Sequence, residues 1–189
     1  TGLQLPSPAI PKGCFVNFIQ IDNLVYLSGH LPQVRTVGYI VGVYMILLSY
    51  LIIYYILLAA DGALIVGKVG EELTVEQGYE ASKYVGLNLL ATLKHNLGDL
   101  DKIKRVVKLF GLVNCVNGFG QQPAVINGCS DLMVKVFGEN GNHVRSAVGT
   151  NSLPYGVAVE IEAIFEIHPK ATTPTSTIAA APEGTPDSK

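Results

Sequence analysis

The sequence predicts an α+β fold in which one sheet carries two helices on one face. The segment "VAVEIEAIFEI", residues 157–167, alternates strictly between apolar and polar side chains, as a half-buried strand does. Residues 74–98 have apolar side chains at helical spacing, and they begin with a Thr-x-x-Gln capping box formed by Thr74 and Gln77. The predicted order of elements is ββ(β)αβαββ, which is typical of an α+β sheet with its helices on one side.

The first elements are short strands. The stretch "CFVNFIQIDNLVYLSG", residues 14–29, contains two apolar runs on either side of the turn pair Asp22-Asn23. A third strand is predicted for "ALIVGKV", residues 63–69. If residues 34–60 are set aside, this strand follows the second one after a short loop, so the two are expected to form a hairpin.

The remaining elements alternate between helix and strand. Gly98 is placed to end the first helix, and "IKRVVKLFGLVNCV", residues 103–116, reads as a strand. Pro123 suits the first turn of a second helix, residues 124–138, which is followed by a short strand at residues 143–149.

The final strand places three carboxylates on one face, those of Glu160, Glu162 and Glu166. Such a face is usually solvated, and a polar cavity or a subunit interface is the alternative. The tail after residue 168 is rich in Pro, Thr, Ala and Ser, so we expect residues 169–189 to be disordered.

Composition and charge limit the classes of function. The chain has 189 residues, of which 49% are hydrophobic and 15% charged, so it can form one domain with an ordinary core. The net charge of −2 argues against a nucleic-acid partner held by bulk charge. The histidines show no metal-ligand spacing, and we expect neither a metal site nor a cofactor.

The three cysteines, Cys14, Cys115 and Cys129, form no CxxC pair and read as reduced core thiols of an intracellular protein. Because the first residue is Thr1 rather than Met, the chain is expected to be a fragment or a processed form. The compartment stays open between the cytoplasm and an organelle matrix, with a membrane-anchored form as the alternative.

Three stretches resemble the RidA/YjgF family, also described as endoribonuclease L-PSP or chorismate mutase-like, and in particular its "putative endoribonuclease" branch. They are "NLVYLSGHLP", the segment from "GKVGEELTVEQGYEASKYVG" to "IKRVVKLFGLVN", and "HVRSAVGTNSLPYGVAVEIEAI". The resemblance covers most of residues 1–33 and 61–168. It implies a chorismate-mutase-like fold, a homotrimeric barrel-type assembly and sites in clefts between subunits.

The resemblance also implies a function and site residues. Well-studied members hydrolyse enamine or imine intermediates of amino-acid metabolism to keto acids and ammonia, whereas others are reported to cleave RNA or act as chaperones. Arg145 matches the arginine that grips the substrate carboxylate, and its planar fork suits that group. Glu160 matches the glutamate that positions or activates water. The backbone around Ala147 matches a further polar contact.

Three positions depart from the family pattern. Phe15 stands where the family has a tyrosine, so the ring remains without its hydroxyl. Ala147 replaces a cysteine that is common in the family. The asparagine of the second helix is best matched by Ser130, whereas Asn127 or Asp131 would need a shift of register. These departures leave two functions open beside an imine hydrolase: a module that binds or protects a small carboxylate without turnover, and an endoribonuclease.

An uncharged apolar run, including "VYMILLSYLIIYYILLAA", interrupts the predicted hairpin. As a helix, residues 37–60 would span about 36 Å, enough for a bilayer core of about 30 Å. A single span would, however, put the two strands of the hairpin on opposite sides of the membrane. The codons CAG-GTA-AGA would encode Gln33-Val34-Arg35, and this nucleotide sequence resembles the end of an exon followed by the start of an intron. A retained intron, a membrane span and a buried extension of the hairpin therefore remain as alternatives for residues 34–60.

Overall fold

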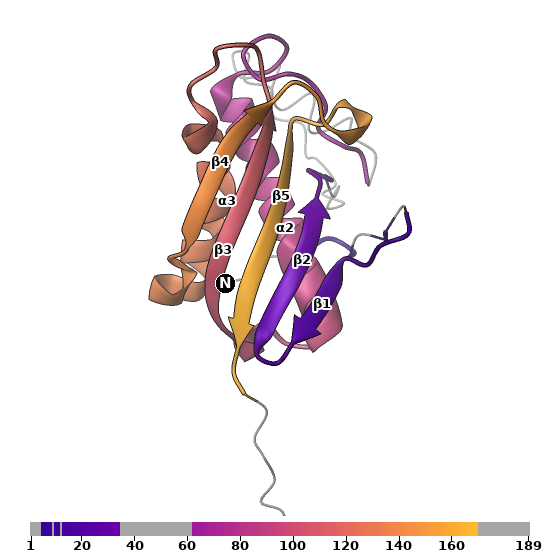
Figure 1. Ribbon diagram of the computed structural model, residues 1–189, viewed down its shortest axis with the longest axis vertical. Helices are drawn as coiled ribbons and strands as arrows, with labels where there is room; N and C mark the ends of the chain where they lie inside the picture. Colours follow the sequence, from indigo (N-terminus) through magenta and orange to yellow (C-terminus); the bar gives the residue numbers. More distant parts are fainter. Residues whose placement is uncertain (1–4, 9, 12, 35–61, 170–189) are drawn as a thin grey trace, which may run out of the picture.

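The structure is a computed structural model that describes residues 5–8, 10–11, 13–34 and 62–169. Five strands form one sheet in the order β1-β2-β5-β3-β4, and both long helices lie on the same face of it (Figure 1). The α+β class predicted from the sequence is therefore confirmed. The strands are β1 (Phe18–Ile21), β2 (Leu24–His30), β3 (Ile103–Asn114), β4 (Val144–Thr150) and β5 (Val159–Ile167). The helices are α2 (Val75–Leu97) and α3 (Gln122–Phe137), with 3-10 turns η1 (Leu100–Lys102), η2 (Gly138–Gly141) and η3 (Pro154–Gly156).

The ends of the helices follow the signals in the sequence. At the start of α2, the Gln77 amide donates to the Thr74 hydroxyl at 3.2 Å, and the Thr74 amide donates to the Gln77 side chain at 2.8 Å. This reciprocal pair satisfies two amides that a helix N-terminus otherwise leaves without a partner. Gly98 ends the helix with φ +84°, a conformation that costs glycine little. Pro123 lies in the first turn of α3, as predicted.

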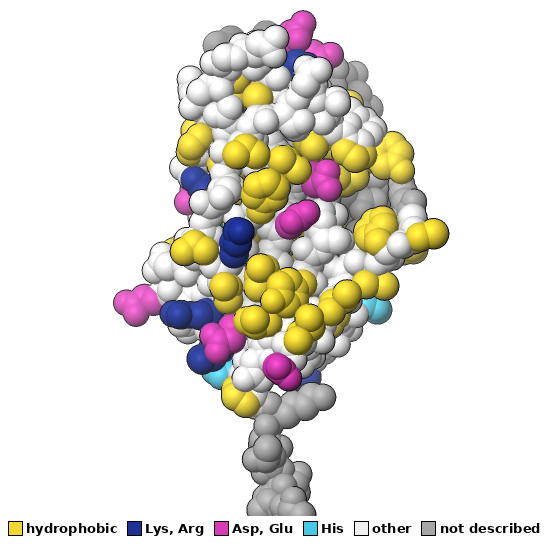
Figure 2. All heavy atoms as spheres, viewed as in Figure 1, with side chains coloured by type: hydrophobic (Ala, Val, Ile, Leu, Met, Phe, Trp, Pro, Cys, Tyr) yellow, Lys and Arg dark blue, Asp and Glu magenta, His cyan; other side chains and the backbone are white. Residues whose placement is uncertain are grey.

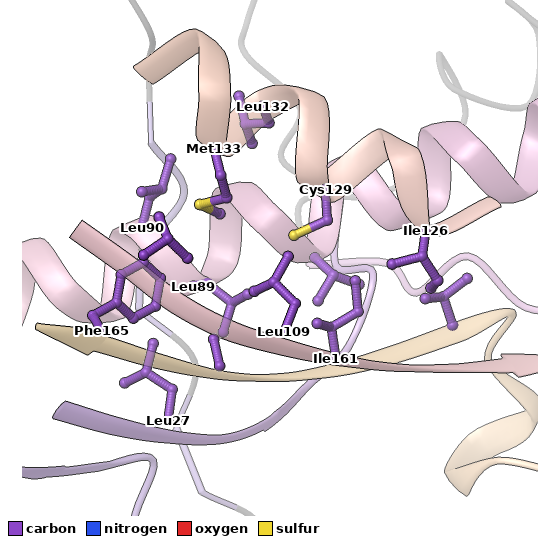
Figure 3. Packing of buried hydrophobic residues seen from close by; sticks show 14 of the residues in the cluster. Leu27, Leu89, Leu90, Leu109, Ile126, Cys129, Leu132, Met133, Ile161 and Phe165 are labelled. Atoms are coloured by element: carbon purple, nitrogen blue, oxygen red, sulfur yellow. The ribbon is translucent and has the colours of Figure 1, made fainter. Parts of the chain in front are cut away.

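The core lies between the sheet and the two helices (Figure 3). Alternate residues of β5, namely Val159, Ile161, Ala163, Phe165 and Ile167, are all buried on this side. They meet side chains from both helices, among them Leu89, Leu90, Ile126, Cys129 and Met133. Each fully buried leucine or phenylalanine contributes about 1.5–3 kcal/mol relative to an exposed one. The alternation read from the sequence therefore describes the packing of β5 correctly.

The two helices approach each other closely at Gly128. A Cβ at this position would overlap the backbone carbonyl of Tyr79 on α2. Nearby, the Ser82 hydroxyl of α2 accepts the Cys129 amide at 3.1 Å and donates to the Ile126 carbonyl at 3.3 Å. The position of α3 is thus fixed by backbone contacts as well as by apolar packing.

Three predictions about the first half are wrong in detail. Cys14 is exposed and is not a core thiol, whereas Cys115 and Cys129 are buried. The first strand begins at Phe18, not at Phe15. Residues 63–69 do not form a strand: they make isolated bridges to four different partners, from Leu64 to Gln33, from Val66 to Val157, and from Val69 to Leu73 and Cys115. This apolar segment is held at separate points instead of along one partner, so alternation alone did not identify its structure.

Val34 and Gly62, the residues on either side of a gap in the described chain, are hydrogen-bonded to each other's segment. The Val34 amide donates to the Ala63 carbonyl at 2.8 Å, and the Gly62 amide donates to the Val34 carbonyl at 2.9 Å. Asn88 of α2 supports this pair by donating to two carbonyls of residues 31–33 at 3.1 Å each. The two ends of the described chain at residues 34 and 62 therefore lie side by side.

The apolar run itself lies outside the described residues, as does the predicted disordered tail from residue 170 onward. Of the helices in the described part, none is both long enough and apolar enough to cross a membrane. Val34, the first residue of the predicted insertion, belongs to the fold: it is buried with 4% of its surface exposed.

Candidate functional site

Arg145 is held by α3. It lies on the edge strand β4, in parallel register with Leu109 of β3. Its Nη1 donates to Asn127 Oδ1 and to Ser130 Oγ, both at 2.9 Å. Its Nη2 donates to the Pro123 carbonyl at 3.4 Å. Asn127 and Ser130 are three residues apart on the helix and so present their polar groups on one face.

All three of these acceptors are neutral. The ion pairs in the described part of the chain are Lys83–Glu80 and Lys104–Glu166, and neither involves Arg145. Within the described residues, therefore, no carboxylate offsets the charge of the guanidinium. Both Nη1 protons are used by α3, and among the described residues no acceptor engages Nε–H or the second Nη2–H. The edge formed by Nε and Nη2 is the one that faces away from the anchored Nη1. This edge can bind a carboxylate through two parallel hydrogen bonds.

Three other predicted positions lie near this arginine in sequence or space. Ser130, the favoured match in the second helix, contacts Arg145 directly, and so does Asn127 without any shift of the chain. Asp131 does not: it accepts the Tyr79 hydroxyl at 2.9 Å. Ala147 lies two residues after Arg145 and packs partly buried against the core. Since β4 is the sheet edge, its outer backbone groups are directed away from β3.

Glu160 lies elsewhere, on the sheet face that the helices do not cover. It lies on β5, opposite Leu112 of β3 and between buried Val159 and Ile161, so its side chain has the opposite direction from theirs. Its carboxylate lies against Gly29 of β2, where a Cβ would overlap Oε1. Burial, and then the negative charge of Glu162, raise the pKa of Glu160 above its usual range. A carboxyl with a raised pKa is better suited to exchange a proton near neutral pH.

Glu160 and Phe15 line the same cavity, which has a volume of about 730 Å³. Gly29, Leu64 and Tyr155 also line it. The volume lies in the range of small-molecule sites. Tyr155 has φ +57°, a left-handed conformation that is strained for a residue with a side chain, and such strain is enriched at functional sites. The cavity thus combines one carboxylate with the rings of Phe15 and Tyr155 and the imidazole of His30.

The structure does not bring Arg145 and Glu160 together within one copy. Arg145 packs against α3 on the helix side, whereas Glu160 faces the cavity on the other side of the sheet. Along the sheet, Glu160 is level with Val148, which is three residues beyond Arg145. A single site containing both residues therefore needs a second copy of the chain.

The uncovered sheet face has the character of a surface that meets another protein. Figure 2 shows hydrophobic side chains spread over this face, with acidic and basic side chains between them. Exposed members include Tyr26 at 40%, Val148 at 40% and Val144 at 66%. A smaller hollow of about 330 Å³ lies between Tyr26, Phe110 and Ile164. Apolar surface of this kind is enriched where subunits associate.

Sequence reasoning missed three residues of this region. Gly29 leaves the space that Glu160 occupies, Tyr155 lines the cavity, and His143 contacts Ser130 at 3.1 Å. The helical spacing of Asn127 and Ser130 was a usable signal, since it places both on one face. No comparable signal marks His143 or Tyr155. The described residues hold no cluster of three His, Cys, Asp or Glu side chains placed for a metal.

Comparison with known proteins gives consistent results. The family described as "YjgF/chorismate mutase-like, putative endoribonuclease" matches residues 22–161. Protein TCP17 of Trypanosoma cruzi is 34% identical over 168 residues, which cover 88% of this chain and 89% of that protein. A protein of unknown function from Agrobacterium tumefaciens has 36% identity and a TM-score of 0.69, over 88% of each chain. A "putative endoribonuclease" from Shewanella oneidensis has 26% identity and a TM-score of 0.71, over 88% of this chain and 93% of that one.

Proposed function

The chain belongs to the YjgF/chorismate mutase-like family, and from this premise we propose that it is a hydrolase of small imines or enamines that carry a carboxylate. Each site is formed by two copies of the chain in a homotrimer. Arg145 of one copy binds the substrate carboxylate, and Glu160 of the other directs water to the reacting carbon. The residues around Ala147 and Phe15 line the rest of this proposed site.

The observation that carries this proposal is the set of neutral anchors around Arg145. An arginine paired with a carboxylate within its own chain would have little charge left for a ligand. Here Asn127, Ser130 and the Pro123 carbonyl fix the group without neutralising it. A fixed, unpaired guanidinium with one free edge suits a carboxylate-bearing small molecule.

The reaction balances without a cofactor. Water adds through its oxygen to the C=N carbon of a 2-imino acid, and Glu160 accepts one of its protons. Glu160 returns this proton to the former imine nitrogen, which gives the tetrahedral carbinolamine. The carbinolamine hydroxyl then loses its proton, by way of Glu160, to the same nitrogen, so that the C–N bond breaks, ammonia leaves and the C=O bond forms. The products are a 2-keto acid and ammonia. The pKa of Glu160, raised by burial and then by the charge of Glu162, supports these transfers, because the group holds a proton more readily than an ordinary carboxyl does.

Substitutions at Arg145 test the binding half by titration calorimetry with pyruvate and 2-oxobutyrate. Arg145→Ala should weaken binding by about 1.5–3 kcal/mol, the range for a hydrogen bond to a charged group, or roughly 10–150-fold. Arg145→Lys keeps the charge but lacks the fork, so its affinity should be intermediate. Arg105→Ala on the exposed side of β3 is the matched control and should bind as the parent does. Unchanged affinity in Arg145→Ala would refute the assignment.

Glu160→Gln tests the catalytic half. It preserves size and removes the base, so keto-acid affinity should stay nearly the same while hydrolysis of 2-aminoacrylate, in a coupled assay, is abolished. If the parent protein binds keto acids without turnover, the protein is a binding module instead. Restoring the hydroxyl with Phe15→Tyr should raise turnover only if the site is catalytic. The parent protein is also assayed for cleavage of RNA. If it cleaves RNA, and Arg145→Ala and Glu160→Gln still do so, the endoribonuclease activity belongs to a site other than the one proposed.

A further inference from the structure

A chain of hydrogen bonds continues behind Arg145 and ends at a histidine that no part of the proposed reaction uses. Ser130 Oγ, which accepts from Arg145 Nη1 at 2.9 Å, lies 3.1 Å from His143 Nε2. His143 Nδ1 in turn lies 2.7 Å from the Gly141 carbonyl. The three side chains are therefore linked in a row that starts at the guanidinium and ends at the backbone between α3 and β4.

The direction of each hydrogen bond follows from the groups involved. The Gly141 carbonyl can only accept, so Nδ1 of His143 carries the proton. In the neutral imidazole Nε2 is then an acceptor, and the Ser130 hydroxyl must donate its single proton to it. The lone pairs of Ser130 Oγ are left for the Arg145 N–H. His143 thus decides which way the Ser130 hydroxyl points.

The backbone that orients His143 is itself fixed. Gly141 is buried at the end of η2, and a Cβ there would overlap the Met133 carbonyl and crowd the Val134 Cα of α3. Only glycine allows this turn to lie so close to the helix. The carbonyl that receives the His143 proton is therefore held against the same helix that carries Ser130.

We propose that His143 is a positioning residue for the carboxylate site: through Ser130 it fixes the Arg145 guanidinium so that the Nε and Nη2 edge faces the ligand. This inference rests on the proposed function for its purpose, but the linkage can be tested without any ligand. A guanidinium free to rotate would spend part of its time with the wrong edge toward the carboxylate, and preorganisation removes that cost.

The first test is ¹⁵N NMR of the Arg145 side chain in the parent and in His143→Phe, which keeps a ring but removes the acceptor. We expect slow rotation about the Cζ–Nη bonds in the parent and faster rotation in His143→Phe. His143→Gln, whose side chain can accept from Ser130, should restore part of the restriction. His95→Phe, at an exposed position of α2, is the control and should leave the Arg145 signals unchanged. Identical Arg145 rotation in the parent and in His143→Phe would overturn the proposal.

The second test is a double-substitution cycle on pyruvate affinity. His143→Phe and Ser130→Ala should each weaken binding about fivefold, the effect of one ordinary hydrogen bond. The double variant should be no weaker than Ser130→Ala alone, because His143 acts through Ser130. Additive losses would contradict the linkage. If His143→Phe does not fold, Ser130→Ala breaks the same chain and is read by the same NMR signals. If the parent binds no keto acid, the proposed function fails, while the NMR result still decides the role of His143.

Discussion

The Arg145 half and the Glu160 half of the proposed site are built in opposite ways. Arg145 is anchored by three acceptors from one helix, with the closest two at 2.9 Å. Glu160 faces a cavity, and in the described part of the chain its carboxylate has no hydrogen-bond partner. One group is fixed and fully charged, whereas the pKa of the other is raised by burial and by Glu162.

This difference separates binding from proton transfer. Binding energy is greatest when a charged group is already in place, since nothing must be ordered when the ligand arrives. A group that exchanges a proton instead needs a pKa close to the working pH. The two requirements conflict within one crowded pocket, and two faces of the sheet can satisfy them separately if a second copy joins them.

The largest expected effect comes from adding one methyl group to the rigid half. In Gly128→Ala the new Cβ overlaps the Tyr79 backbone carbonyl, which cannot move without displacing α2 or α3. We expect the free energy of unfolding to fall by about 3 kcal/mol, as for a severe overpacking change. Gly120→Ala is the control, because nothing lies within 4 Å of its Cβ. Urea denaturation measures both, and equal stabilities would show that the helix contact is not rigid.

A glycine-to-alanine substitution in the Glu160 half, at Gly29, should have a different effect. In Gly29→Ala the Cβ overlaps the far end of the Glu160 side chain, which can rotate away. We expect a loss of stability below about 1 kcal/mol together with a large loss of turnover, because the carboxylate leaves its place. Pyruvate affinity should change little, since Arg145 is untouched. Calorimetry and the coupled assay are the measurements. A large loss of affinity with intact turnover would reverse the roles assigned to the two halves.

A smaller effect is expected from Glu162→Gln, which removes the neighbouring charge that helps to raise the Glu160 pKa. The acidic limb of the turnover profile should move to lower pH. Stability should respond as well: a carboxyl whose pKa is raised in the folded protein stabilises it below the unfolded value, about pH 4.3, and this contribution is lost as pH rises through the folded pKa. Glu162→Gln should lessen that loss. An unmoved acidic limb would show that burial alone sets the pKa.

The smallest effect is expected from replacing residues 35–61 by Asn-Gly. The Gly62 amide already donates to the Val34 carbonyl at 2.9 Å, the Val34 amide donates to the Ala63 carbonyl at 2.8 Å, and Gly62 has φ +92°. This is the pattern of a three-residue hairpin loop that ends in a G1 bulge, so two inserted residues followed by Gly62 can complete the loop. Folding, trimer formation and pyruvate affinity should therefore remain close to those of the parent, which sedimentation and calorimetry can check. Loss of folding in the shortened chain, with a stable parent in detergent, would show that the run is structural.

Much of the fold could be predicted from the sequence because its signals are local. The alternation in β5 and the capping box at Thr74 each describe one element through its own residues. The strand predicted for residues 63–69 was wrong because most of their bridge partners, Gln33, Cys115 and Val157, lie far apart in the chain. In the site, Arg145, Glu160 and Ser130 were predicted from the resemblance of the sequence to the RidA/YjgF family. His143 became visible only when the turn at Gly141 placed it beside Ser130.

The central claim is that two copies of the chain share one site, and a crystal structure with bound pyruvate tests it most directly. We expect the pyruvate carboxylate to accept hydrogen bonds of about 2.7–3.2 Å from Nε and Nη2 of Arg145 in one protomer. Glu160 of the partner subunit should lie beside the keto carbon of the same molecule. Pyruvate bound away from Arg145, or bound at Arg145 with no Glu160 from a second copy nearby, would contradict the account.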